Sequence, residues 1–248
     1  MKITTTIRNI FTLITGYWIY KKSALPPGVD LKIDIQNKLK INPNIIFDVG
    51  ANVGQSIKGF KKLFPESTIY SFEPIKDTYQ KLLSTAVLYT KVITENFALG
   101  SFEGNIDVSI YDEKDSVLNS LIQTSMNHNK DATKESIKQT SLDKYCERNK
   151  IEIIDLLKID TEGYELEVLK GALKTIKNNK IKLILCEVGF SRRYKRHTCI
   201  SELNDFLSEK GFCFFHIYDS NPYLLKKEMH YANALYISSH FAPEKVII

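Results

Sequence analysis

The chain has 248 residues, of which 43% are hydrophobic and 11% aromatic. Because a chain of this size and apolar content can bury a full core, we exclude disorder, a collagenous repeat and a linker-like protein for the bulk of it. The 34 Lys and Arg residues against 29 Asp and Glu residues give a formal charge of +5, spread mostly as scattered lysines. This diffuse charge permits anionic partners but does not favour nucleic acid.

The cysteine and histidine spacings predict neither a disulfide framework nor a metal site. The four cysteines contain no CxxC pair, and this pattern in a long chain favours a reducing, cytoplasmic location. His197 and Cys199 lie close together in the sequence, but structural zinc sites have four such ligands, so we predict no metal at this pair.

Residues 1–22 carry apolar side chains at helical spacing, which predicts one amphipathic helix. The segment is too polar to span a bilayer and lacks a signal-peptide cleavage pattern. Two interpretations remain open. The helix packs on the domain or forms a homodimer with a second subunit, or it makes a peripheral membrane contact with Tyr17, Trp18 and Tyr20 beside Lys21 and Lys22.

Pro26 and Pro27 interrupt the chain after this helix, and a second short helix is expected over 30–40. We therefore divide the chain into an N-terminal helical extension, 1–40, and a main domain, 41–248.

From Ile45 onward, apolar runs of strand length alternate with helical patterns, which predicts a doubly wound α/β fold with a parallel sheet covered on both faces. The polar stretch Asp112–Ser136 is expected to be a long loop, of the kind that often forms a lid. The expected strands are 44–49, 68–72, 92–98, 105–111, 153–159, 181–188, 212–218 and 232–238, and the expected helices are 55–64, 75–85, 165–177 and 200–210.

The ends of the first two strands predict a nucleoside site. Gly50 and Gly54 follow the first strand and allow a tight turn before a helix N-terminus, with Asp48 just before them. Glu73 ends the second strand, 23 residues after Gly50 (73 − 50), where a carboxylate would hold a ribose diol. The turn lacks the GxGxxG spacing of dinucleotide sites, so a dinucleotide-dependent oxidoreductase is the disfavoured alternative.

These and further motifs resemble those of the FkbM family of S-adenosylmethionine-dependent methyltransferases. The resemblance spans about Ile45 to Ile237 and rests on DVGANVGQS at 48–56, SFEP at 71–74, ENFALG at 95–100, the SL pair at 120–121 and IDLLKIDTEGYELEVLKGA at 154–172. It implies a Rossmann-like class I methyltransferase fold, with a seven-stranded, mostly parallel sheet and an N-terminal helical extension. It also implies methyl transfer to a hydroxyl of a small molecule, such as a sugar, glycan or natural product.

The resemblance also implies roles for individual residues. The methionine part of the cofactor would contact Asp48, Gly50, Asn52 and Gly54, the ribose would bind Glu73, and the adenine would lie on Phe97 and Ala98 at the tip of the third strand. Asp160, Thr161, Glu162 and Gly163 would face the same crevice from the tip of the strand over 153–159.

Methyl transfer to a hydroxyl needs a general base close to the methyl group. Asp160 is the first candidate and Glu187 the second, while Glu162 and His197 are weaker. Alternatively, Asp160 and Glu187 hold a divalent cation that lowers the pKa of the hydroxyl, although the sequence does not require one. A non-catalytic module that binds the cofactor or docks on a membrane is a further alternative.

The basic cluster from Arg192 to His197 follows a strand end closely. We expect either a solvated loop or a grip on a phosphate or carboxylate of the substrate.

Overall fold

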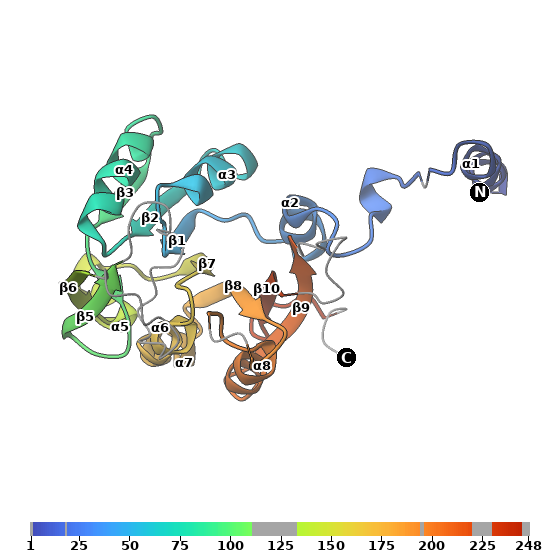
Figure 1. Ribbon diagram of the computed structural model, residues 1–248. Helices are drawn as coiled ribbons and strands as arrows, with labels where there is room; N and C mark the ends of the chain where they lie inside the picture. Colours follow the sequence, from blue (N-terminus) through green and yellow to red (C-terminus); the bar gives the residue numbers. More distant parts are fainter. Residues whose placement is uncertain (1, 18, 111–132, 194–195, 220–229, 245–248) are drawn as a thin grey trace.

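A seven-stranded sheet forms the centre of the computed structural model, which describes residues 2–17, 19–110, 133–193, 196–219 and 230–244. Its strand order is β3-β2-β1-β7-β8-β10-β9, and β10 alone among them runs antiparallel to its neighbours (Figure 1). The order reverses between β1 and β7, which is the point where ligands bind in sheets of this type. The sheet strands are β1 (Ile45–Val49), β2 (Thr68–Phe72), β3 (Val92–Glu95), β7 (Ile154–Ile159), β8 (Ile181–Gly189), β9 (Phe212–Tyr218) and β10 (Tyr231–Ser238).

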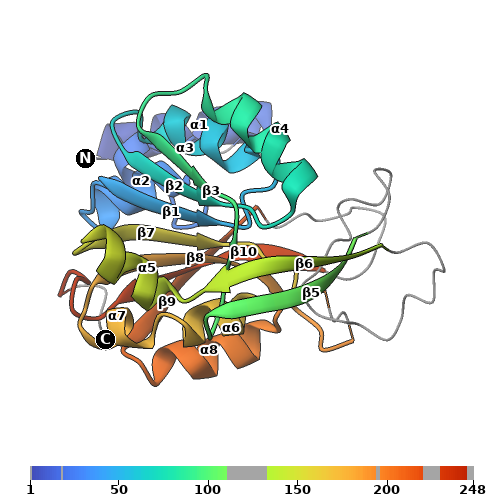
Figure 2. The ribbon, with the colours of Figure 1, turned by 90° about the vertical axis from the view of Figure 1, so that its left-hand side faces the viewer.

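Helices cover both faces of this sheet (Figure 2). One apolar cluster lies between the sheet and α5, α6, α7 and α8, and a second lies between the sheet and η2, α3 and α4. Burial on both faces explains why β1 and β7 are almost wholly apolar. The helices are α1 (Lys2–Thr15), η1 (Lys22–Ala24), α2 (Leu31–Ile33), η2 (Asp34–Lys38), α3 (Gln55–Leu63), α4 (Lys76–Ala86), α5 (Leu142–Asn149), α6 (Glu165–Lys170), α7 (Leu173–Lys177) and α8 (Ile200–Ser208).

The predicted doubly wound α/β fold and its seven-stranded, mostly parallel sheet are confirmed, but the third strand is shorter than expected. β3 ends at Glu95 rather than at Ala98. The side-chain amide of Asn96 donates hydrogen bonds to the carbonyls of Glu73 and Pro74, and the chain turns there. Ala98 and Leu99 then form β4 in a second, three-stranded sheet.

This second sheet has the order β4-β6-β5, with β5 over Gly104–Ile110 and β6 over Thr133–Thr140. Residues 112–132 of the predicted loop, with the SL pair at 120–121, lie outside the described residues, but 133–136 belong to β6, so the prediction is wrong for them. The strand could not be predicted from this polar sequence, because strand prediction relies on alternating apolar side chains. In β6 the buried apolar contact to β5 is made by Ile137. The prediction also misses α5, which begins where the Ser141 hydroxyl caps the backbone N–H of Lys144.

The single helix predicted over 165–177 is interrupted at Gly171. A Cβ on Gly171 would lie 2.0 Å from the carbonyl oxygen of Gly100, so only glycine allows this close approach of the second sheet. The carboxylate of Asp143 then accepts hydrogen bonds from the backbone N–H groups of Lys174 and Thr175, and α7 begins separately.

The N-terminal helix is shorter than the predicted 1–22. α1 ends at Thr15 because Gly16 takes a left-handed conformation, with φ 71°. α1 stands away from the α/β domain (Figure 1), and its apolar side chains are exposed, with Ile14 77% accessible. Packing of this helix on its own domain is therefore contradicted. None of the helices in the described ranges is both long and apolar enough to cross a membrane.

The second predicted helix, over 30–40, is observed as α2 and the π-helical turn η2. Ile35 and Leu39 are buried in the core of the domain, so the packed unit extends upstream of residue 41.

Candidate active site

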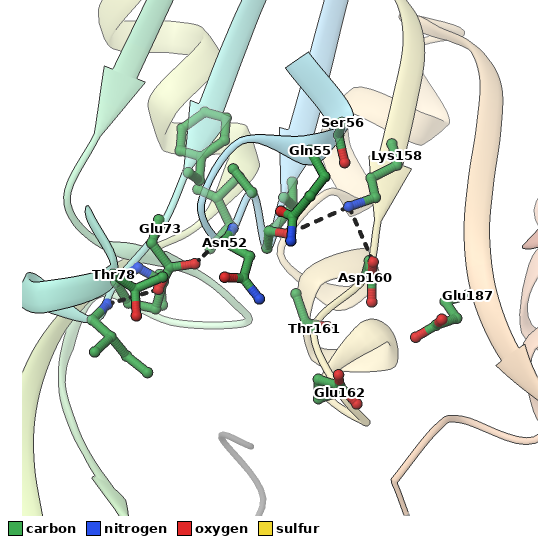
Figure 3. A pocket seen from close by; sticks show the side chains of 18 of the residues that line it. Asn52, Gln55, Ser56, Glu73, Thr78, Lys158, Asp160, Thr161, Glu162 and Glu187 are labelled. Atoms are coloured by element: carbon green, nitrogen blue, oxygen red, sulfur yellow. Dashed lines mark hydrogen bonds and ion pairs between the residues drawn. The ribbon is translucent and has the colours of Figure 1, made fainter. Parts of the chain in front are cut away.

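A cavity of about 420 Å³ opens at the carboxyl ends of β1, β2, β7 and β8, beside the point where the strand order reverses. Its volume lies in the range of roughly 300–1,000 Å³ that is usual for small-molecule sites. Glu73 and Thr78 lie at one side of it and Asp160 and Glu187 at the other, with Asn52 between them (Figure 3). The lining residues are Val49–Asn52, Gln55, Ser56, Phe72–Ile75, Thr78, Phe97–Leu99, Lys158, Asp160–Glu162, Glu187, Arg196, His197 and Tyr231.

The turn between β1 and α3 brings backbone close to the cavity. Gly50 has φ 78°, and a Cβ there would lie 1.8 Å from the carbonyl oxygen of Asp160. Asn52 and Gly54 also have left-handed backbones, with φ 49° and 93°. The glycines are therefore needed for the turn and for the contact between the first strand and the loop after β7.

The Glu73 carboxylate is fixed at the end of β2 by backbone donors. Its Oε2 accepts a hydrogen bond from the N–H of Asn52 at 3.0 Å, and its Oε1 accepts one from the N–H of Ile75 at 3.0 Å. Burial raises the pKa of Glu73 to about 7. Each oxygen can accept a further hydrogen bond, so the group is suited to the two hydroxyls of a ribose.

A buried lysine lies below the turn. The Lys158 ammonium is 3.1 Å from Asp48 Oδ1 and 3.2 Å from Asp160 Oδ2, and it donates to the Gly50 carbonyl at 3.3 Å. Burial alone would lower the pKa of Lys158, but the two carboxylates outweigh it and hold the pKa above its usual range. Burial would likewise raise the pKa of Asp160, and Lys158 reverses this to a net lowering. Asp160 is therefore a stable anion and a weak base.

Glu187 and His197 form a second polar pair in the cavity. His197 Nδ1 lies 3.1 Å from Glu187 Oε2, and the imidazole ring packs beside Tyr231 with centroids 5.2 Å apart. Burial raises the pKa of Glu187 to about 7. Burial would lower the pKa of His197, but the contacts with Glu187 outweigh it, so this pKa lies above the usual 6.5. A base oriented by a carboxylate can take a proton from a bound hydroxyl.

A buried carboxylate ties together the two loops that carry these groups. Glu165 is 0% exposed, and its Oε1 accepts hydrogen bonds from Thr161 and from the N–H of Gly163. Its Oε2 accepts from the N–H and hydroxyl of Thr198, at 3.1 and 2.6 Å. Glu165 thus holds the loop after β7 against the segment that carries His197.

The structure brings most of the predicted site residues to one cavity. Gly50, Asn52, Glu73, Phe97, Ala98, Asp160 and Glu187 line it, with Phe97 and Ala98 placed after β3 rather than at its tip. Asp48 and Gly54 are not among the lining residues. Asp48 is fully buried beneath the turn, and Gly54 packs against Thr85.

Sequence reasoning missed Lys158, Glu165 and Tyr231. One signal for Lys158 was available, because a lysine within a mostly apolar, buried strand needs a buried acid as partner. In the basic cluster, Arg192 pairs with Glu202 at the surface, whereas Arg196 lines the cavity.

Three side chains that could hold a metal ion meet at the cavity, because Glu162, Glu187 and His197 have ligand atoms within 4.8 Å of one another. Each already has a partner. Arg196 makes a two-pronged ion pair with Glu162, and His197 faces Glu187. Asp160, which the sequence paired with Glu187 for a cation, is bound to Lys158.

The strand order, with one antiparallel strand, and the cavity at the switch point are those of the class I methyltransferase fold. Residues 48–214 match the family model described as the methyltransferase FkbM domain, and the chain belongs to this family. The predicted family and cofactor are thus confirmed.

Two curated relatives of the chain are methyltransferases by name. The chain is 24% identical to the 2-O-methyltransferase NoeI of Sinorhizobium fredii over 193 residues, 73% of this chain and 79% of that protein. It is 25% identical to the hexuronic acid methyltransferase AglP of Haloferax volcanii over 147 residues, 59% of this chain and 57% of that protein.

Solved structures resemble the chain more distantly. The pre-rRNA processing protein fibrillarin of Methanococcus jannaschii matches with a TM-score of 0.48 and 15% identity, over 80% of this chain and 67% of fibrillarin. The methyltransferase domain of METTL16 matches with a TM-score of 0.49 and 10% identity, over 94% of this chain and 77% of that domain.

Proposed function

We propose that the protein is an O-methyltransferase that moves the methyl group of S-adenosylmethionine to a hydroxyl of a sugar or glycan. Two observations support a carbohydrate acceptor. The names of both curated relatives describe methyltransferases, one of a 2-O position and one of a hexuronic acid. The acceptor side of the cavity is also lined by polar groups that suit a polyhydroxylated ligand, among them Glu162, Arg196 and Tyr231.

The cavity residues support one orientation of the cofactor. Glu73 would accept hydrogen bonds from the ribose hydroxyls, and Phe97 and Ala98, beyond Glu73, would contact the adenine. The turn from Gly50 to Gln55 would contact the methionine part, which would place the reacting carbon toward Asp160 and Glu187 (Figure 3). His197 lines the same cavity and pairs with Glu187 there. When bound, S-adenosylmethionine supplies a methyl group made electrophilic by its sulfonium.

We assign the general base to His197, with Glu187 as its positioning residue. Nδ1 of His197 faces Glu187, so Nε2 is the nitrogen that takes the proton of the acceptor hydroxyl. The Glu187 carboxylate stabilises the imidazolium that forms, as in other base-and-orienter pairs. Asp160 was the first candidate from sequence, but its ion pair with Lys158 lowers its pKa and makes it the weaker base.

Asp48 and Lys158 would act through the turn rather than by touching the acceptor. Lys158 joins Asp48, Asp160 and the carbonyl of Gly50, so it holds β1 and β7 together beneath the cofactor. The loss of Lys158 would leave the buried carboxylate of Asp48 and that of Asp160 without their counter-charge, which is strongly unfavourable.

The observation that carries the proposal is the placement of a diol-binding carboxylate, Glu73, and a histidine–carboxylate pair, His197 and Glu187, at opposite sides of one cavity. The test is release of S-adenosylhomocysteine with a panel of nucleotide sugars, glycolipids and phenols, followed by intact mass spectrometry of each product. We expect a mass gain of one methylene on a sugar hydroxyl. Transfer to a phenol with no transfer to any sugar would contradict the carbohydrate acceptor.

A divalent cation held by Glu162, Glu187 and His197 is the second candidate for activating the hydroxyl, because ligand atoms of these three side chains lie within 4.8 Å of one another. The same assay with EDTA separates the two mechanisms. Transfer that persists in EDTA supports His197, whereas transfer that EDTA abolishes and Mg²⁺ restores supports the cation.

A further inference from the structure

The apolar stripe of α1, made of Ile7, Ile10, Phe11 and Ile14, lies on the surface of the molecule. Ile7 is 62% exposed and Ile14 77% exposed, and Leu13 beside the stripe is 87% exposed. Helical spacing of 3.6 residues per turn puts the four stripe residues on one side, whereas Arg8 and Asn9 lie off it. An exposed apolar patch of this kind marks an interaction site.

The charge of this segment indicates what covers the stripe. Residues 1–29 contain four basic side chains, Lys2, Arg8, Lys21 and Lys22, and no acidic one. Two copies of α1 packed stripe to stripe would bring together charges of one sign, with no acidic complement on the helix. An anionic surface complements these charges, and each basic residue near such a membrane surface strengthens binding by roughly fivefold.

The residues after the helix suit the boundary between lipid and water. Tyr17 is 72% exposed and Tyr20 44% exposed, beside Lys21 and Lys22. Tyrosine has an apolar body and a polar tip, so it prefers the headgroup level of a bilayer.

The connection to the domain leaves α1 able to lie flat on a surface. Among the described residues after α1, the first hydrogen bond to a buried group of the domain is at Gly28, whose N–H donates to Asp34 Oδ2 at 2.7 Å. Residues 16–27, with Pro26 and Pro27, separate that point from the end of α1. Figure 1 shows the helix well apart from the sheet.

We propose that α1 docks the protein on an anionic lipid bilayer, with the apolar stripe in the interface and the helix axis parallel to the membrane plane. The helix is too short and too polar to span the bilayer, and its combination of an apolar stripe and purely basic charge is typical of interfacial anchors. This proposal is independent of the acceptor, because it rests on residues outside the cavity.

The test is flotation of the full-length protein with phosphatidylcholine vesicles, with and without one quarter phosphatidylglycerol. Two double variants are compared with the unchanged chain. Ile7→Glu with Ile14→Glu disrupts the stripe, and Asn9→Glu with Thr12→Glu makes the same change of two charges on the other side of the helix. S-adenosylmethionine affinity, measured by calorimetry, checks that both variants remain folded.

We expect the unchanged chain to float with the anionic vesicles and to bind the neutral ones at least tenfold less tightly. The stripe variant should lose roughly a further tenfold or more relative to the charge-matched control, because it removes apolar burial as well as charge. Three results would overturn the proposal: no binding of the unchanged chain, equal losses in the two variants, or a vesicle-free dimer that the stripe variant alone converts to monomer.

Discussion

At the scale of single residues, two buried groups have opposite tasks in the proposed mechanism. Glu73 would bind the ribose through an anionic carboxylate that burial makes harder to ionise, and His197 would take up a proton and be stabilised in its charged form by Glu187. Both groups therefore link function to pH near neutrality.

Replacement of His197 by Gln should lower kcat by roughly 10²–10⁴-fold, the usual contribution of a general base. The affinity for S-adenosylmethionine should stay within a few-fold, because the base faces the acceptor. Steady-state kinetics and calorimetry measure the two effects. A kcat within threefold of that of the unchanged enzyme would remove His197 from the mechanism.

Glu187→Gln tests the positioning role through the pH profile. Only neutral His197 can accept a proton, so kcat should fall toward acid pH with an apparent pKa above 6.5 in the unchanged enzyme. Without the Glu187 carboxylate the imidazolium is less stable, and the acid limb should move to lower pH while kcat decreases. A merely structural role would lower kcat without moving the limb.

Glu73→Gln should weaken S-adenosylmethionine binding by roughly 10–100-fold, since charged acceptors make hydrogen bonds worth about 1.5–3 kcal/mol. In the unchanged protein, affinity should also fall as the pH drops below about 7, because the raised pKa means that Glu73 becomes protonated there. Glu66→Gln is the matched control, since that side chain is 88% exposed. Equal affinities for the two variants in calorimetry would contradict the assignment.

At the scale of elements, the site depends on contacts that only particular backbones allow. Gly50→Ala would place a Cβ 1.8 Å from the Asp160 carbonyl and so force β1 and the loop after β7 apart. We expect the free energy of unfolding to fall by about 3 kcal/mol and cofactor binding to be lost. Gly59→Ala in α3 meets nothing within 4 Å and should stabilise the protein by about 0.5–1 kcal/mol. Urea unfolding measures the stability of both variants. Equal changes for Gly50→Ala and Gly59→Ala would contradict the special requirement for glycine at position 50.

Glu165 allows a second test at this scale. Glu165→Gln replaces one of the two accepting oxygens by an NH₂ group, so the buried donors of either Thr198 or Gly163 lose their acceptor. Each unsatisfied donor should lower the free energy of unfolding by about 1–3 kcal/mol. The variant should unfold at lower urea and show reduced kcat, because His197 is carried by the segment that Glu165 holds. Glu167→Gln should cost less than about 1 kcal/mol, since its ion pair with Lys170 is partly exposed.

At the scale of the whole molecule, alternation of apolar strands and helices was enough to predict the sheet and its switch point. Residues with strong local signals, such as Gly50 and Glu73, were therefore placed correctly at one cavity. Features set by contacts distant in the chain could not be predicted. The second sheet follows from pairing of polar β6 with β5, and the break at Gly171 follows from its contact with Gly100.

The same distinction between local sequence signals and contacts distant in the chain holds for the chemistry of the site. The acids at the strand tips were visible in the sequence, but their partners were not all visible, because Lys158 meets Asp48 and His197 meets Glu187 only in the fold. A carboxylate's role as base or as ion-pair partner depends on those neighbours. For this reason we propose His197 rather than Asp160 as the base.

The central claim is that the cavity holds the methyl donor with its ribose on Glu73 and its sulfur toward His197. The most direct measurement is a crystal structure of the protein with S-adenosylhomocysteine. We predict density for both ribose hydroxyls within hydrogen-bond distance of the Glu73 carboxylate, and for the sulfur on the side of the cavity that carries His197 and Glu187. Density outside the cavity, or a sulfur that faces away from His197, would contradict the account.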